Sequence, residues 1–248
     1  LSPEAATGYA AAVETSLAGN TDPDIDRFGA HVLAMVDGEY RSSVITHPDN
    51  GILPFNEYGT SLSGHAYFIG RGYDGPEDRP GTERCTEAWG DPPMRAFMYQ
   101  LFHGFVQSAE TIAIVSEEVN PVRIIHMGEK RRPEAVTGFG GHSVGRWEGN
   151  TLVVETTNFN GGASFRGTTE NLTLTERYTR VAAGVLEYQF TVDDPTVWTR
   201  PWTGMFRWDL DPSQYELVEY SCHEGNYGMT NILSGARARD AEAAGGQQ

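Results

Sequence analysis

The stretch LTLTERYTRVAAGVLEYQFTV at residues 172–192 decides the fold of this chain. Apolar and polar side chains alternate on both sides of the turn at 182–184, which is the pattern of half-buried antiparallel strands. Glu176 and Tyr178 fall on the apolar face of the first segment, and Tyr188 falls on the apolar face of the second. The stretch therefore predicts two strands whose interior contains a carboxylate and two tyrosines.

Comparable short segments, rich in β-branched and aromatic residues, occur at 97–107, 111–117, 122–127, 152–157, 204–209 and 215–222. Turn residues separate them, and no helical pattern lies between them. We therefore predict a mainly β fold, in which an antiparallel meander over 96–235 closes into a lipocalin-like (calycin-type) β-barrel. Around it we expect a short N-terminal helix at 1–20, an irregular turn-rich segment at 21–95 that packs on the barrel, and a flexible tail at 236–248.

The charge of the chain restricts its partners. With 18 basic and 34 acidic residues the formal net charge is −16, which argues against nucleic acids and anionic membrane surfaces because both require a basic patch. No apolar run approaches the roughly 18–20 residues of a membrane span, so membrane insertion is not expected. A small molecule is the expected partner, and the sequence is compatible with either a monomer or a homo-oligomer.

The two cysteines, Cys85 and Cys222, allow free thiols, a redox pair or a disulfide. Their separation excludes a C-x-x-C redox motif, and two thiolates alone make a poor zinc site, so no metal is expected. The chain begins at Leu1 rather than Met, as it would after removal of a signal peptide. We therefore expect a secreted or periplasmic protein in which Cys85 and Cys222 form a disulfide.

Glu176 needs a partner or a raised pKa if it faces the interior. One interpretation is a buried ion pair with Arg177, Arg180 or Arg200. The other is a general acid or base that lines a cavity.

Two further clusters contain residue types that transfer protons. His142 stands in a glycine-rich stretch that is expected to be a loop before the strand at 152, either as a proton-transfer group or as a loop anchor. His223 and Glu224 follow Cys222 at the expected end of a strand. The aromatic segment around Trp198 and Trp202 predicts either a rim around a ligand or a plug at one barrel end.

The segments ERC at 83–85, PPM at 92–94, GHSVGRWEGNTLVVET at 141–156, ERY at 176–178, TRPW at 199–202 and CHEGNYGM at 222–229 carry a family resemblance. Over roughly residues 40–238 the chain resembles a large family of exported bacterial proteins that are usually described only as hypothetical proteins. The resemblance implies a bacterial source and export, and it implies no particular reaction.

These observations favour a cofactor-independent acid–base enzyme that catalyses a lyase, isomerase, cyclase or hydrolase step on a small, partly apolar molecule or sugar derivative. The expected catalytic residues are His142 or His223 together with Glu176, and Tyr188 or Tyr178 as a hydrogen-bond donor to an oxyanion. The expected substrate-binding residues are Arg146, Trp147, Tyr178, Trp198, Arg200, Trp202, Glu224 and Tyr227. The alternatives are a periplasmic carrier that uses the same cavity without catalysis, with Glu176 paired to arginine, and an interaction module without a cavity.

Overall fold

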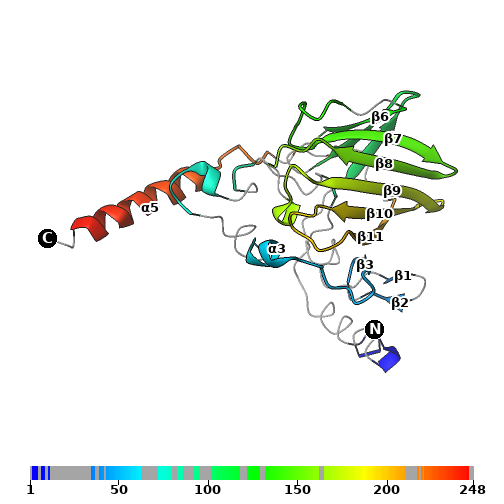
Figure 1. Ribbon diagram of the computed structural model, residues 1–248, viewed down its shortest axis with the longest axis horizontal. Helices are drawn as coiled ribbons and strands as arrows, with labels where there is room; N and C mark the ends of the chain where they lie inside the picture. Colours follow the sequence, from blue (N-terminus) through cyan, green and yellow to red (C-terminus); the bar gives the residue numbers. More distant parts are fainter. Residues whose placement is uncertain are drawn as a thin grey trace.

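The computed structural model describes residues 43–62, 72–79, 83–85, 92–94, 102–117, 122–128, 132–161, 165–210 and 221–245. It also describes residues 2–4, 7, 8, 11, 35, 36, 39–41, 217 and 219. Within these residues the fold is mainly β, as predicted, and most of the strands belong to one nine-stranded sheet (Figure 1).

The strands of the large sheet are ordered β3-β11-β10-β9-β8-β7-β6-β5-β4. A separate pair is formed by β1 (Met35–Val36) and β2 (Glu39–Tyr40). The bounds of the large sheet are β3 (Ile45–His47), β4 (His103–Gln107), β5 (Thr111–Ser116), β6 (Val122–Met127), β7 (His142–Glu148), β8 (Thr151–Thr157), β9 (Thr173–Ala182), β10 (Val185–Asp193) and β11 (Trp202–Asp209).

Neighbouring strands of the large sheet are antiparallel, except that β6 and β7 run parallel. Strands β7 to β11 follow each other as the predicted meander, and β4 to β6 form a second one. Among the described strands, β3 and β4 form the two edges of the large sheet, and they are not hydrogen-bonded to each other. The β-rich prediction is therefore confirmed, whereas closure into a lipocalin-like barrel is not.

The large sheet is strongly curled. This follows from contacts between side chains of strands that are far apart in the strand order. Phe105 on β4 lies edge-on to Tyr178 on β9, with ring centroids 5.9 Å apart. Four strands lie between β4 and β9, so a flat sheet would separate them by about 24 Å. His103 on β4 similarly lies 5.4 Å from Trp208 on β11. The curl brings the two edges towards each other around an enclosed face, which we call the inner face.

The inner face carries the hydrophobic core. Along β9 the buried residues are Leu174, Glu176 and Tyr178, and along β10 they are Tyr188, Phe190 and Val192. This confirms the prediction of which alternate side chains of these two strands face the interior. The rings pack closely enough to exclude even a methyl group at one position of β11: a Cβ on Gly204 would lie 2.5 Å from the Phe190 ring.

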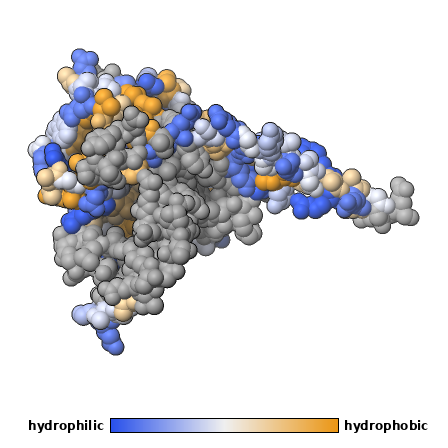
Figure 2. All heavy atoms as spheres, turned by 180° about the vertical axis from the view of Figure 1, so that it is seen from behind, coloured by the Kyte–Doolittle hydropathy of each residue, from blue (hydrophilic) through white to orange (hydrophobic). Residues whose placement is uncertain are grey.

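Helix α5 (Gly228–Gly245) projects away from the sheet (Figure 1). Only Leu233 and Ala236 of this helix are buried, and the face of the helix that Figure 2 shows is mostly hydrophilic. Between residues 43 and 210, the described helical segments are the short α3 (Glu57–Leu62) and the 3₁₀ turns η1 (Pro76–Asp78) and η2 (Phe165–Gly167). None of the described helices is long and apolar enough to cross a membrane.

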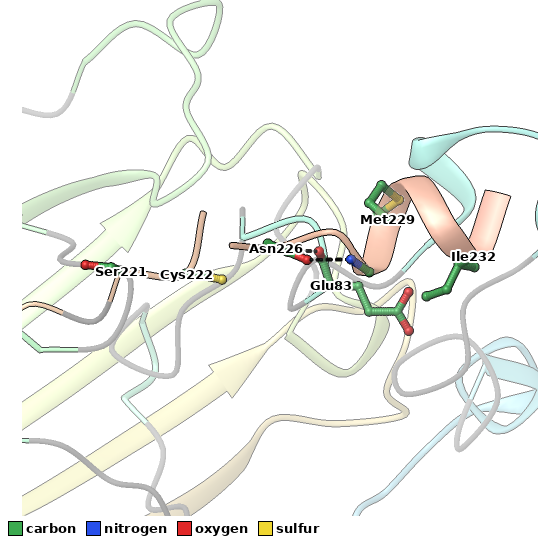
Figure 3. Close-up of a pocket in the computed structure, with 7 residues that line it drawn as sticks. Glu83, Ser221, Cys222, Asn226, Met229 and Ile232 are labelled. Atoms are coloured by element: carbon green, nitrogen blue, oxygen red, sulfur yellow. Dashed lines mark hydrogen bonds between the residues drawn. The ribbon is translucent and has the colours of Figure 1, made fainter. Parts of the chain in front are cut away.

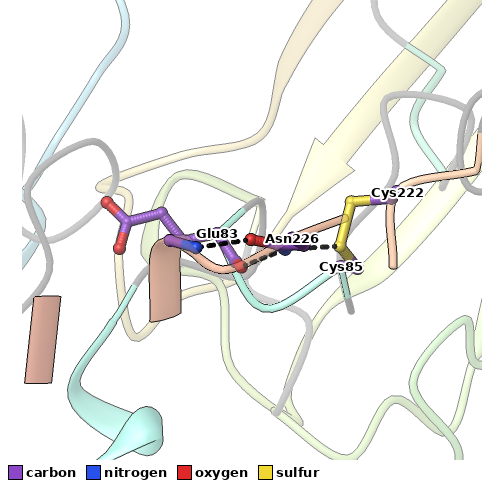
Figure 4. Close-up of a disulfide and its surroundings, with 5 residues drawn as sticks. Glu83, Cys85, Cys222 and Asn226 are labelled. Carbon is purple, nitrogen blue, oxygen red and sulfur yellow. Dashed lines mark hydrogen bonds between the residues drawn. A yellow bond between two sulfur atoms is a disulfide. The ribbon is translucent and has the colours of Figure 1, made fainter. Parts of the chain in front are cut away.

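The predicted disulfide is present: Cys85 and Cys222 are bonded across 137 residues of sequence. It joins the segment at 83–85 to the turn that precedes α5 (Figure 4).

Several predicted elements differ from the structure. The expected loop around His142 is strand β7, which a two-residue turn connects to β8, and Gly149 in that turn has a φ of +63°. In the segment 215–222, predicted as a strand, the described residues are not in a strand: Leu217, Glu219, Ser221 and Cys222. Most of the expected flexible tail at 236–248 belongs to α5, which also includes residues 228–235 of the predicted barrel. Residues 3, 4, 7, 8 and 11 of the predicted N-terminal helix are helical, Ser2 is not, and the rest of the segment 1–20 lies outside the described residues.

Candidate functional site

Glu176 is fully buried on the inner face and is surrounded by hydrogen-bond donors. Its Oε1 accepts hydrogen bonds from Tyr188 Oη at 2.7 Å, from Arg123 Nη1 at 2.8 Å and from Tyr178 Oη at 3.0 Å. Its Oε2 accepts a hydrogen bond from Arg123 Nη2. The Tyr188 hydroxyl in turn accepts the backbone N–H of Met94 at 3.0 Å. The carboxylate is therefore held from several directions by the protein itself.

Arg123 reaches Glu176 by crossing the inner face of β7 and β8. On the way, its Nε donates to Ser143 Oγ at 3.1 Å and its Nη2 donates to Thr156 Oγ1 at 2.8 Å. Both of these side chains are small, which leaves room for the guanidinium between β6 and β9. The partner of Glu176 is thus an arginine that the sequence analysis did not consider, rather than Arg177, Arg180 or Arg200.

The electrostatics of this cluster keep Arg123 and the two tyrosines in fixed protonation states. Burial alone would lower the pKa of Arg123, but the charge of Glu176 raises that pKa above its ordinary value. Burial and the charge of Glu176 both raise the pKa values of Tyr178 and Tyr188 well above the ordinary value. Both tyrosines therefore remain hydrogen-bond donors at neutral pH, and Arg123 remains a cation.

His142 lies on the outer face of the sheet, opposite Glu176. The neighbouring Ser143 turns its hydroxyl to Arg123 on the inner face, and successive side chains of a strand point to opposite faces. The ring of His142 lies 5.0 Å from that of His126, and the residue is 5% exposed. The predicted acid–base pair of His142 and Glu176 is therefore separated by the sheet.

His223, Glu224 and Tyr227 lie outside the inner face as well. They belong to the exposed segment between the disulfide and α5, where residues 222–225 form turns. Tyr227 is 74% exposed. The structure therefore does not bring His223 together with Glu176 either.

The remaining predicted binding residues are also dispersed. Trp198 and Trp202 are buried and pack against each other with ring centroids 5.8 Å apart, as expected for a plug rather than for a rim. Arg146 is exposed and paired with Glu148 at 2.8 Å, Trp147 is 50% exposed at the end of β7, and Arg200 is exposed. Tyr178 and Tyr188 are the only predicted site residues that contact Glu176 among those described.

A pocket of about 390 Å³ lies beside the disulfide, at the start of α5 (Figure 3). Met229 and Ile232 of α5 provide an apolar wall. The rest of the lining is polar or formed by the disulfide and the helix start: Glu83, Ser221, Cys222, Asn226 and Gly228. This pocket was not predictable from strand periodicity, although the segments ERC and CHEGNYGM that meet in it are part of the family resemblance.

The polar groups of this pocket are held in place by neighbouring residues. Arg79 binds the Glu83 carboxylate with two hydrogen bonds of 2.9 Å. The Asn226 amide donates to Glu83 O at 3.4 Å and to Cys85 Sγ at 3.3 Å, and its Oδ1 accepts the N–H of Gly228 at 3.2 Å (Figure 4). Asn226 therefore fixes the start of α5 against the disulfide, which preforms the pocket.

Comparison with known proteins adds no relative: no family model, no curated protein and no solved structure matches this chain. Within the described residues, no group of three or more His, Cys, Asp and Glu side chains is arranged to hold a metal ion. The candidate site therefore depends on geometry alone.

We expect His103, on the inner side of β4, to make the stability of the fold depend on pH. Burial lowers the pKa of His103 from 6.5 to about 4, although the charge of Glu117 opposes the shift. Between these pH values the unfolded chain binds a proton that the folded chain does not bind, so stability is complete above pH 6.5 and falls as the pH falls towards 4. Since His103 is only partly buried, we expect a loss of about 1–2 kcal/mol between pH 8 and pH 5.

This pH dependence can be isolated with the variant His103→Gln, whose amide can still bond to Ser116, the present partner of His103 Nδ1 at 2.7 Å. Urea unfolding of both proteins at pH 8, 6.5 and 5 is the measurement. The variant should lose about 1–2 kcal/mol less than the wild type over this range. Equal losses in the two proteins would show that other groups cause the acid sensitivity.

Proposed function

We propose that this chain is an exported small-molecule binding protein, a carrier without catalysis, and that its ligand site is the pocket between the disulfide and α5. The observation that carries the proposal is the pocket itself, whose volume of about 390 Å³ falls within the roughly 300–1,000 Å³ of ligand sites. Its lining combines an apolar wall with a few oriented polar groups, as such sites usually do.

The acid–base enzyme is the less favoured function because its groups are not assembled. A general base must be within reach of the proton that it removes, whereas the oxygens of Glu176 are occupied by Arg123, Tyr178 and Tyr188. The pairing of Glu176 with an arginine is what the carrier interpretation predicts. The inner face then has a structural role, and the ligand binds elsewhere.

Export and a barrel-like form are parts of the same proposal. A disulfide between Cys85 and Cys222 suits an oxidising compartment such as the periplasm or the outside of the cell. The curl of the sheet, with His103 of β4 beside Trp208 of β11, is the geometry from which a lipocalin-like barrel would close.

The proposal can be tested by filling the pocket. We expect a screen of small, partly apolar compounds to raise the Tm, because a ligand at a hundredfold excess over its Kd contributes about 2.7 kcal/mol. For a chain of this size that is a shift of roughly 5–10 °C. The variant Ile232→Trp should lose this shift, because its indole would occupy the apolar wall.

The matched control is Ala241→Trp, which adds the same side chain to an exposed position of the same helix. It should leave the ligand-induced shift unchanged. A ligand that stabilises Ile232→Trp as much as the wild type would place the binding site elsewhere, and a screen without a stabilising compound would argue against the carrier function.

A further inference from the structure

The pocket beside the disulfide has an acidic lining. Among the described residues that line it, Glu83 is the only one with a formal charge, and none is a cation. The Glu83 side chain extends its carboxylate towards Ile232 of α5 (Figure 3). A ligand in this pocket therefore meets a carboxylate next to an apolar wall.

Arg79 orients this carboxylate without lining the pocket. Its Nε donates to Oε2 of Glu83 and its Nη2 donates to Oε1, both at 2.9 Å. The Arg79 side chain is only 5% exposed, whereas that of Glu83 is 31% exposed. A carboxylate has about four acceptor positions, so this contact with two hydrogen bonds leaves one position on each oxygen for a ligand.

The charge of Arg79 does not turn the pocket into an anion site. Because Arg79 is not among the residues that line the pocket, the head group of a ligand comes into contact with the oxygens of Glu83 and not with the guanidinium. At longer range, a chain with a formal net charge of −16 attracts cations and repels anions. Both the contact and the field therefore favour a positively charged head group.

The amide of Asn226 has no proton left for a ligand. Its Nδ2 donates to Glu83 O at 3.4 Å and to Cys85 Sγ at 3.3 Å, which uses both of its protons. Its Oδ1 accepts the N–H of Gly228 at 3.2 Å and has a second lone pair. Among the described side chains of the lining, Glu83 and Asn226 thus provide acceptors, and the hydroxyl of Ser221 can either donate or accept.

We propose that the ligand of this pocket is a small amphipathic primary amine, whose ammonium group donates to the Glu83 carboxylate and whose aliphatic part packs on Met229 and Ile232. An ammonium has three donors and no acceptor, which complements a lining of acceptors. Its hydrogen bond to a carboxylate is charge-assisted and roughly twice as strong as a neutral one. This inference rests on the proposed function in one respect, namely that the pocket is the ligand site.

The first test uses probes that share one aliphatic chain and differ in the head group: octylammonium, octyltrimethylammonium, octanol and octanoate. Calorimetry with the oxidised protein should show octylammonium binding at least tenfold more tightly than the other three. Octyltrimethylammonium has the same charge but no N–H donor, and octanol has a donor but no charge. Equal or tighter binding of any of the three would overturn the assignment of a primary amine.

The variant Glu83→Gln tests the carboxylate, because it removes the charge and keeps the size of the side chain. It should bind octylammonium about tenfold to hundredfold more weakly than the wild type. The matched control is Glu187→Gln, which removes a carboxylate of similar exposure, 28%, that is also paired with an arginine but does not line the pocket. Both variants change the net charge by one, so equal weakening would show that the acidic surface as a whole, rather than Glu83, attracts the amine.

The variant Arg79→Met distinguishes ligand recognition from a structural role of the ion pair. Without the guanidinium the full charge of Glu83 acts on the ligand, so this variant should bind octylammonium more tightly than the wild type. If the pair only shapes the pocket, breaking it from either side should weaken binding, and weaker binding in both Arg79→Met and Glu83→Gln would overturn the proposal. The double variant Arg79→Met with Glu83→Gln leaves no unpaired charge and serves if a single variant does not fold. It should bind octylammonium at least tenfold more weakly than the wild type, and wild-type affinity would overturn the role of Glu83.

The two proposals fail in different ways. If the octyl probes bind without a preference for the ammonium group and Ile232→Trp abolishes that binding, the carrier function stands and the amine inference is wrong. If octylammonium binds equally well to Ile232→Trp and to the wild type, the pocket is not the site, and both proposals fall.

Discussion

Replacement of Arg123 by Met is expected to lower the free energy of unfolding by about 3–5 kcal/mol. The substitution leaves Glu176 fully buried without its counter-charge, although Tyr178 and Tyr188 still donate to it. Breaking one side of a buried ion pair is costly because the remaining charge has already lost its water. Urea unfolding followed by tryptophan fluorescence measures this loss.

The double variant Arg123→Met with Glu176→Gln separates the charge from the packing. The glutamine keeps an oxygen that can accept the tyrosine hydroxyls, and it no longer needs a counter-charge. We therefore expect the double variant to be more stable than Arg123→Met alone, with a coupling between the two sites of about 1–3 kcal/mol.

A matched surface control is Arg146→Met, which breaks the exposed pair with Glu148. Exposed pairs contribute at most about 1 kcal/mol, so this variant should stay close to the wild type. If Arg123→Met costs no more than Arg146→Met, the buried pair is not what holds the inner face together.

The face of the strand on which Glu176 lies was predictable, because it depends only on the alternation of apolar and polar residues along the strand. The two-residue period of a strand predicts that Glu176, Tyr178 and Tyr188 face the interior. All three residues are buried in the structure. The partner of Glu176 was not predictable in the same way, because Arg123 is 53 residues distant in sequence. It becomes a neighbour only after β6 to β9 have paired and the sheet has curled.

Glycine content misled the interpretation of strand β7. Glycine usually weakens a strand, so Gly141, Gly145 and Gly149 suggested a loop. Gly145 instead lies inside the strand, where a Cβ would come within 2.7 Å of Ile125 and 2.8 Å of Met127. Because Gly145 has no side chain, Ile125 and Met127 of the parallel strand β6 can pack directly against it. This contact between β6 and β7 exists only in the folded protein.

The helix after Cys222 was missed for a different reason. Core-facing helices are recognised by an apolar stripe, and α5 buries only Leu233 and Ala236. Its start is instead fixed by Asn226, which bonds to Gly228 N and Cys85 Sγ. Because this anchoring depends on the disulfide, neither α5 nor the pocket at its start could be derived from periodicity.

Removal of the disulfide is the change for which we expect the second large effect. The variant Cys85→Ser with Cys222→Ser should lose about 2–5 kcal/mol of unfolding free energy, since a cross-link over 137 residues restricts the unfolded chain strongly. Urea unfolding of the oxidised wild type, the reduced wild type and the variant is the measurement. The last two should agree with each other and unfold at lower urea than the first.

Loss of the disulfide should also act locally, because Cys222 and the Asn226 contact to Cys85 form one side of the pocket. Under conditions where the reduced protein is still folded, we expect its affinity for a compound that binds in this pocket to fall at least tenfold. The inner-face cluster does not include these residues, so the sheet and its tryptophan fluorescence should stay native. Unchanged affinity after reduction would show that the pocket keeps its shape without the cross-link, and that the ligand site and the disulfide are independent features of the fold.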